Sequence, residues 1–163
     1  MRLISHRGNL NGPDPINEND PLHVLEVIRH GFDVEIDIRY INDQWFLGHD
    51  EPEYKIDFAE FILPNSDNLW IHAKNEDALA ELNHRHMWDL HYFWHQTDKY
   101  ALTSKSRLWV YPGEKLLKES VWVLPENTCD IKTDIDFMNF DGYAICSDYV
   151  RTIRDRFIGV DLW

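Results

Sequence analysis

The sequence contains few of the features that mark secreted or membrane proteins. Its 163 residues include only two cysteines, Cys129 and Cys146. Two cysteines do not make a disulfide framework, and we expect two free thiols in a reducing compartment. No run approaches the roughly 20 apolar residues of a membrane span, and the N-terminus has no apolar signal segment. These absences predict a cytoplasmic protein with no membrane span.

Basic residues are also scarce. Lys and Arg number 16 against 29 Asp and Glu, which gives a net charge of -13 with neutral histidines. Nucleic acids and anionic membranes attract clustered Lys and Arg, so the composition argues against both as partners. A small phosphate-bearing substrate remains open, because local cations or a bound metal can attract it.

The chain has no internal repeat and no low-complexity linker. Hydrophobic residues make up 44% of it and aromatic residues 13%, which is enough to fill a packed core. The length suits one folding unit. We therefore expect a single domain over residues 1–163.

Residues 33–50 give the clearest indication of a strand and a functional site, and the rest of the chain is interpreted relative to them. From Asp33 to Ile41 apolar and polar residues alternate, which is the period of a β-strand. Glu35 and Asp37 then project from the same face, roughly 6–7 Å apart along the strand. Two such carboxylates repel each other unless a cation screens them, so they suit a divalent ion. The alternative is an ordinary solvated strand face.

Hydrophobic periodicity predicts alternating strands and helices along the chain. Asp20 before Pro21 predicts a helix start, with Asp20 as the N-cap. Helices are expected over residues 21–30, 56–63, 75–86 and 148–156, with one or two further turns over 114–119. Eight principal strands are expected near residues 4, 36, 71, 93, 101, 110, 123 and 145, besides a short returning strand over 44–47.

Eight strands alternating with helices predict a parallel sheet closed into a (β/α)8 TIM-type barrel. Such barrels usually need roughly 200 residues or more, and this chain is shorter. We therefore expect a reduced barrel, in which several helices of the second half are short or missing. An open doubly wound sheet is the alternative fold.

Three short motifs stand in order at expected strand ends. They are His6-Arg7-Gly8, Glu35-x-Asp37 and Gly48-His49-Asp50. Their order and context resemble the glycerophosphodiester phosphodiesterase family and, more broadly, its sphingomyelinase D relatives. Weaker similarities to that family lie at Glu18-Asn19, Asp141-Gly142 and Ser147-Asp148-Tyr149. The likeness is dense over residues 3–50, patchy over 69–74 and thin until residue 141, so we expect a shortened member.

The resemblance implies phosphodiester cleavage by two histidines and a divalent cation. His6 and His49 would form the acid/base pair, since an imidazole with a pKa of about 6.5 can give and take a proton near neutrality. Glu35 and Asp37 would hold the cation, commonly Mg²⁺ or Ca²⁺, which neutralises charge on the phosphoryl oxygens. Arg7 would bind phosphate through two hydrogen bonds.

The third strand departs from the family pattern. The family usually supplies a third carboxylate there, in a Glu-x-Lys pattern, whereas this chain has His72-Ala73-Lys74. His72 would serve as the third ligand, which shifts the site toward Mn²⁺ or Zn²⁺, or it would be a supporting or core histidine. Lys74 keeps the family's cation facing phosphate. Glu18 would support the metal site or merely begin a loop-to-helix turn.

The expected function is hydrolysis of a small glycerophosphodiester-like substrate. The alternatives are a lyase that releases a cyclic phosphate and an inactive phosphate-binding module. Short loops at the mouth would also admit a larger diester, such as one in a glycan. A shortened barrel could cover bare strands by forming a homodimer. Trp94, His95, Tyr111 and Glu126 fall near strand ends, where they would line a pocket or serve as ordinary packing.

Overall fold

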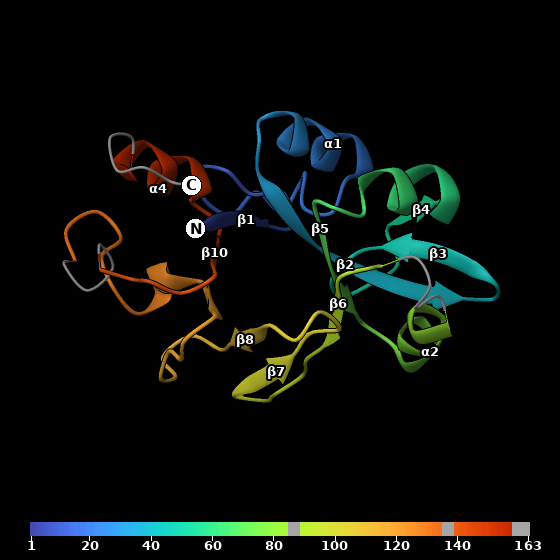
Figure 1. Ribbon diagram of the computed structural model, residues 1–163. Helices are drawn as coiled ribbons and strands as arrows, with labels where there is room; N and C mark the ends of the chain where they lie inside the picture. The colour runs from blue at the N-terminus through green and yellow to red at the C-terminus, as the bar shows by residue number, and fades with distance from the viewer. Residues whose placement is uncertain (85–88, 135–138, 158–163) are drawn as a thin grey trace.

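The computed structural model describes residues 1–84, 89–134 and 139–157, and its main feature is one strongly curved sheet (Figure 1). Eight strands follow the curve in the order β6–β5–β2–β1–β10–β9–β8–β7. Their bounds are Arg2–His6 (β1), Asp33–Ile41 (β2), Leu69–Ala73 (β5), Tyr92–Trp94 (β6), Tyr100–Leu102 (β7), Leu108–Val110 (β8), Ser120–Val123 (β9) and Ala144–Ser147 (β10).

The sheet is mixed. Neighbouring strands from β6 round to β8 are parallel, whereas β7 runs antiparallel to β8. Beyond β1, the second half of β2 pairs with β3 (Gln44–Leu47), which pairs with β4 (Tyr54–Ile56), both antiparallel. Within the described residues no strand ladder joins β6 to β7. Their ends are linked just past β7, where Tyr92 O accepts from Ser104 N at 2.8 Å and Tyr92 N donates to Ser104 Oγ.

The predicted (β/α)8 TIM-type barrel is wrong: the chain folds into a half-barrel with few short helices. Strands occur near all eight expected positions, but the links in the second half carry no described α-helix. Residues 95–99, 103–107 and 111–119 are turns and loops, too short for the dozen or more residues of a helical crossover. The chain therefore makes a β7–β8 hairpin there. The open doubly wound alternative fails too, because the helices lie on the outer side of the curve (Figure 1).

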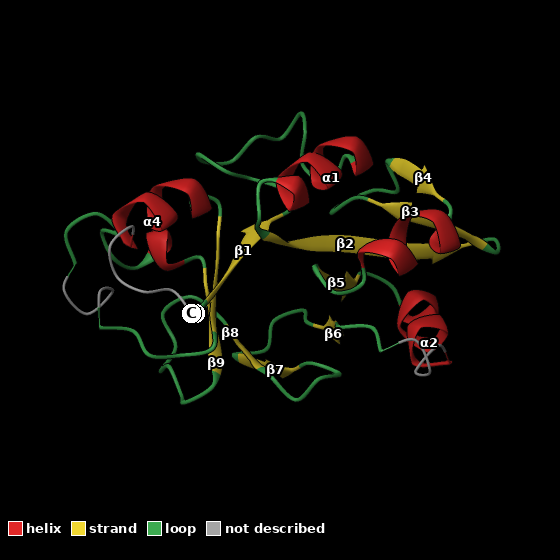
Figure 2. Cartoon of the chain, turned by 45° about the horizontal axis from the view of Figure 1, so that its top comes forward, coloured by secondary structure: helices red, strands yellow, loops and turns green. Residues whose placement is uncertain are grey.

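Of the α-helices in the described residues, three cover the outer side of the first half and its junction with the last strand. They are α1 (Pro21–Arg29), α2 (Glu76–His84) and α4 (Val150–Phe157), and Figure 2 shows them apart from the strands β7–β9. Val24 and Val27 of α1 pack in one core with the outward side chains Val34, Ile36 and Ile38 of β2, all fully buried. The apolar half of the β2 alternation therefore faces the helices.

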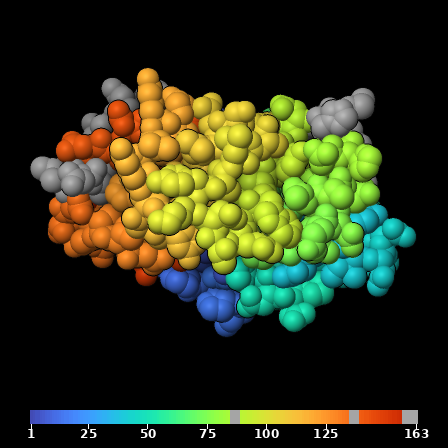
Figure 3. Space-filling model, turned by 90° about the horizontal axis from the view of Figure 1, so that it is seen from below, coloured from blue at the N-terminus to red at the C-terminus, as the bar shows by residue number. Residues whose placement is uncertain are grey.

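The inner side of the curve holds a second, more aromatic core. Trp70, Phe93 and Trp109 meet there, with ring centroids 6.0 Å apart for Trp70–Trp109 and 4.4 Å for Phe93–Trp109. Residues of the second half, yellow to orange in Figure 3, cover the lower face of the molecule. Aromatic rings from β5, β6 and β8 thus pack together on the inside of the sheet.

Some predictions of local secondary structure are confirmed and others are wrong. The N-cap is confirmed, since Asp20 accepts from the backbone N–H groups of Leu22 and His23. The helix expected over 56–63 is instead a π-helix, η1 (Phe58–Ile62), followed by a 3₁₀ turn, η2 (Leu63–Asn65). Residues 114–119 are not helical, and a 3₁₀ turn, η4 (Pro125–Asn127), was not expected. The last two residues of the helix expected over 75–86 lie outside the described residues.

The two cysteines are confirmed as free thiols, with Cys146 buried and Cys129 partly exposed. Among the described residues, no helix combines the length and the apolar composition needed to cross a bilayer.

Candidate active site

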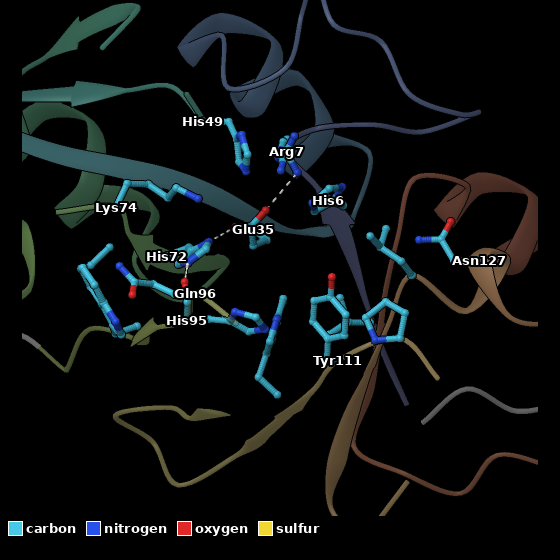
Figure 4. Close-up of a pocket in the computed structure, with 16 residues that line it drawn as sticks. His6, Arg7, Glu35, His49, His72, Lys74, His95, Gln96, Tyr111 and Asn127 are labelled. Carbon is cyan, nitrogen blue, oxygen red and sulfur yellow. Dashed lines mark hydrogen bonds and ion pairs between the residues drawn. The ribbon is translucent and has the colours of Figure 1, made fainter. Parts of the chain in front are cut away.

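A cavity of about 460 Å³ opens where the parallel strands end (Figure 4). Strands β1, β2, β5, β6, β8 and β9 contribute side chains, and the segments that follow β1, β3, β5, β6, β8 and β9 contribute the rest. The lining residues are His6, Arg7, Glu35, His49, His72, Ala73, Lys74, Trp94, His95, Gln96, Trp109, Tyr111, Pro112, Val123, Leu124 and Asn127. This is the edge at which a parallel sheet gathers its functional side chains.

Strand register brings the charged residues together. Because Val34, Ile36 and Ile38 face the helices, Glu35 and Asp37 face the inside of the curve. Glu35 stands beside His6 of β1, and Asp37 stands beside His72 of β5. Residues distant in sequence therefore become direct neighbours across two parallel ladders.

Asp37 lies at the centre of this group and is fully buried. Its Oδ1 is 3.1 Å from His72 Nδ1 and 3.6 Å from Lys74 Nζ, and its Oδ2 is 3.1 Å from Arg7 Nε. Asn19 also donates to Oδ2 and accepts from the Asp37 backbone N–H. Burial would raise the pKa of Asp37, but the cationic neighbours outweigh it and hold this pKa well below its usual range. Asp37 is therefore a carboxylate.

His72 connects the carboxylates to the next strand. Its Nε2 donates to the backbone carbonyl of His95 at 2.9 Å, because a carbonyl can only accept. Its Nδ1 faces Asp37 and lies 3.6 Å from Glu35 Oε1. Burial lowers the pKa of His72, but the two carboxylates overcome this effect and raise it to about 9. Without a bound metal, protonated His72 adds its positive charge to those of Arg7 and Lys74 beside the carboxylates.

Glu35, Asp37 and His72 also fit a divalent metal. Each offers one ligand atom, and the three atoms lie within 4.8 Å of one another. The buried Asp37 Oδ1 accepts no hydrogen bond of good geometry from the described residues, although two cationic nitrogens lie near it. The His95 carbonyl fixes the His72 ring with Nδ1 toward the carboxylates, as outer-shell partners of metal-binding histidines do. Two carboxylates and one imidazole suit Mn²⁺ or Zn²⁺ better than Ca²⁺.

His6 is oriented from the opposite end of the chain. Its Nδ1 lies 2.7 Å from Oδ1 of Asp148, immediately after β10, and Asn9 Nδ2 donates to the same oxygen. Burial lowers the pKa of His6, but the hydrogen bond to Asp148 and the charge of Glu35 leave it raised overall. The Asp148 contact occupies Nδ1, so Nε2 is the nitrogen available to a ligand.

His49 reaches the cavity from the loop after β3. Its Nδ1 lies 2.7 Å from Asp50 Oδ1, and Arg39 Nη2 donates to the backbone carbonyls of both residues. Gly48 precedes it with φ of 143°, and a Cβ at Gly48 would collide with the Glu51 carbonyl. The loop that presents His49 therefore requires glycine at position 48.

Arg7 is held in the left-handed region, with φ of 54°. Its backbone N–H donates to Glu35 O, and its guanidinium lies 3.1 Å from Oε2 of Glu18. Glu18 also accepts from Asn9 Nδ2. Glu18 thus supports Arg7 and Asn9 and does not line the cavity.

All eight residues singled out from the sequence lie in or behind this one pocket. His6, Arg7, Glu35, His49, His72 and Lys74 line it, whereas Asp37 and Glu18 lie behind its wall. Trp94, His95 and Tyr111 line it too, but Glu126 does not. Glu126 accepts from Ser147 Oγ and the Asp148 backbone N–H, so it braces the turn that carries Asp148.

The positions of Asp148 and Asn9 beside His6, and of Gln96 and Asn127 in the pocket wall, were not predicted from the sequence. Asp148 was noted only as part of a weak similarity. A polar residue directly after a strand was the signal that could have identified Asp148 and Gln96.

Comparisons with protein-family models, curated proteins and solved structures give no match for this chain.

Proposed function

We propose that this protein is a metal-dependent phosphodiesterase that cleaves a small diester by two-histidine acid/base catalysis. The observation that carries the proposal is the convergence of two histidines, two carboxylates, Arg7 and Lys74 on one pocket. The likeness of the three motifs to glycerophosphodiester phosphodiesterases supports it. The helix-rich barrel implied by that likeness is not seen, so the support comes from the site.

His6 is suited to act as the general acid. Its raised pKa favours the protonated form, and Asp148 leaves Nε2–H free to protonate a departing alkoxide. His49 then acts as the general base toward the attacking hydroxyl, with Asp50 orienting its ring. The two imidazoles flank Arg7 in Figure 4, so a phosphoryl group beside Arg7 could meet both.

Arg7 and Lys74 are suited to bind the phosphoryl oxygens. Both line the pocket, and Arg7 is held by Glu35 and Glu18 from behind. A guanidinium offers paired donors to phosphate, whereas the ammonium of Lys74 supplies a point charge. A cation held by Glu35, Asp37 and His72 would withdraw charge from the phosphoryl oxygens.

One observation favours a second candidate, a phosphate-binding module without turnover. Asp37 is already compensated by Arg7, His72 and Lys74. Such a cluster is stable without a metal, and it would still present Arg7 and Lys74 to an anion. A lyase that forms a cyclic phosphate uses the same residues as the hydrolase and differs only in the attacking hydroxyl.

Phosphorus NMR of sn-glycero-3-phosphoethanolamine tests these candidates. The protein is incubated with the diester in EDTA and then with Mg²⁺, Mn²⁺, Zn²⁺ or Ca²⁺. We expect cleavage only with metal, strongest with Mn²⁺ or Zn²⁺. Glycerol phosphate as the product indicates a hydrolase, whereas a persistent cyclic phosphate indicates a lyase. If no metal permits cleavage while calorimetry detects binding of inorganic phosphate, the module is correct and the enzyme proposal is refuted.

A further inference from the structure

The pocket has two chemically different ends. The charged side chains of Arg7, Glu35 and Lys74 gather at one end with His6, His49 and His72. The opposite end is formed by the segments after β6, β8 and β9 (Figure 4). The side chains lining that end include no carboxylate, ammonium or guanidinium group. A phosphodiester has the same division, with a charged phosphoryl group and an alcohol on each side of it.

The uncharged end presents aromatic faces and free polar groups. Tyr111 is half exposed, and its ring centroid lies 5.3 Å from that of His95. Gln96 and Asn127 are exposed, and their amides, like the Tyr111 hydroxyl, have no hydrogen-bond partner among the described residues. In Figure 4 the Tyr111 hydroxyl points toward the charged end of the pocket. These groups can both donate and accept hydrogen bonds without bringing a charge.

We propose that the uncharged end binds the alcohol part of the diester, and that this alcohol is a neutral polyol or sugar. Hydroxyl groups both donate and accept, which matches the two amides and the phenol. The C–H face of a sugar or cyclitol ring packs well against an aromatic ring. A volume of about 460 Å³ lies in the range of small-molecule sites, roughly 300–1,000 Å³, and can hold both parts.

A cationic alcohol such as choline is the main rival, because aromatic rings also attract ammonium groups. Such sites are normally completed by a carboxylate. Here the only carboxylate among the described lining residues is Glu35, which lies in the charged end beside Arg7 and His72. Arg7 and Lys74 line the same cavity and would repel a second cation. An anionic alcohol would meet no cation at the uncharged end.

Two methyl phosphodiesters, of myo-inositol and of choline, test the choice of alcohol. This inference rests on the proposed phosphodiester cleavage, so methyl p-nitrophenyl phosphate reports separately on that chemistry. With metal present, we expect kcat/KM for the inositol diester to exceed that for the choline diester by about tenfold. An equal or reversed preference in a protein that cleaves methyl p-nitrophenyl phosphate overturns the inference and leaves the proposed function standing.

Substitution of the amides locates the preference. Gln96→Leu and Asn127→Leu each remove one neutral hydrogen bond, so each should lower the inositol-to-choline ratio roughly threefold to tenfold. Gln44, the other glutamine of the chain, is exposed on β3 outside this pocket, and Gln44→Leu should leave the ratio unchanged. If neither amide variant changes the ratio, these residues do not select the alcohol and the inference fails.

A binding measurement does not depend on turnover. Calorimetry on the His6→Ala variant with both methyl diesters should give a dissociation constant about tenfold lower for the inositol compound. Equal affinities contradict the inference even if no diester is ever cleaved. If the inositol diester binds more tightly but the parent protein cleaves nothing, the choice of alcohol holds and the proposed catalysis fails.

Discussion

The two halves of the curved sheet differ in what covers them and in what they carry. The half containing β1, β2 and β5 has helices packed on its outer side and supplies His6, Glu35 and His72. The half containing β6 to β9 has turns and a hairpin in place of helices and supplies the uncharged pocket wall. His6, Glu35 and His72 therefore lie on strands packed from both sides, whereas the groups that we assign to substrate choice lie on loops.

The pKa values of His72 and His91 show the same contrast between the two halves. In the first half, the carboxylates Glu35 and Asp37 raise the pKa of His72 to about 9, although burial opposes the shift. In the second half, burial and the nearby cations Lys105 and Arg107 lower the pKa of His91 to about 3. His91 also stacks on Trp70 and bonds to Thr103 Oγ1. The first half therefore holds a charged imidazole beside two carboxylates, and the second half holds a neutral imidazole packed in the core.

Removing His6 from the first half of the sheet should have the largest effect, and this effect is on activity. His6→Ala deletes the proposed general acid, so turnover of sn-glycero-3-phosphoethanolamine, whose departing alkoxide needs a proton, should fall roughly 10²- to 10⁴-fold. The exposed His84→Ala is the matched control and should keep full activity. Circular dichroism should show both variants folded. A folded His6→Ala variant with parental turnover would show that His6 in the first half of the sheet is not the general acid.

Replacing His91, in the second half of the sheet, should change the stability of the protein and leave its activity unchanged. In the unfolded chain the pKa of His91 returns to about 6.5. Because the folded pKa is lower, its stabilising effect is present above pH 6.5 and is lost progressively as pH falls toward 3. His91→Gln cannot titrate. The parent's stability relative to this variant should therefore fall by about 1–2 kcal/mol between pH 8 and pH 5.

Urea unfolding in EDTA at the two pH values measures this change. Gln44→Leu, an exposed substitution that involves no titratable group, is the control and should show no pH-dependent difference from the parent. If the difference between parent and His91→Gln is the same at both pH values, His91 is not held neutral. Loss of diester cleavage in the His91→Gln variant would contradict the division between the two halves.

The strand positions could be predicted from sequence because each strand carries its own apolar periodicity. The alternation around Glu35 and Asp37 also predicted that both side chains project from the same face of the strand. The order of the motifs predicted which residues meet at the pocket. The way the sheet ends could not be predicted, because pairing of β7 with β8 depends on the short links around them. Eight expected strands were taken to predict a closed barrel, although the links in the second half are too short for crossover helices.

The partners of the site residues were less accessible than the residues themselves. Asp148 reaches His6 because β10 pairs with β1, a contact across nearly the whole chain that no local pattern encodes. Arg39 follows Asp37 in the strand alternation and would be assigned to the same face, yet its role is to hold the backbone of His49. Supporting residues of this kind depend on the tertiary fold.

The central claim is that Glu35, Asp37 and His72 hold a cation beneath the two histidines. Anomalous diffraction from crystals of the protein soaked in Mn²⁺ tests it most directly. The account predicts one strong peak at coordination distances of about 2.0–2.3 Å from a carboxylate oxygen of Glu35, one of Asp37 and His72 Nδ1. A crystal with no peak between these three side chains, from protein that still cleaves a diester when supplied with Mn²⁺, would contradict it.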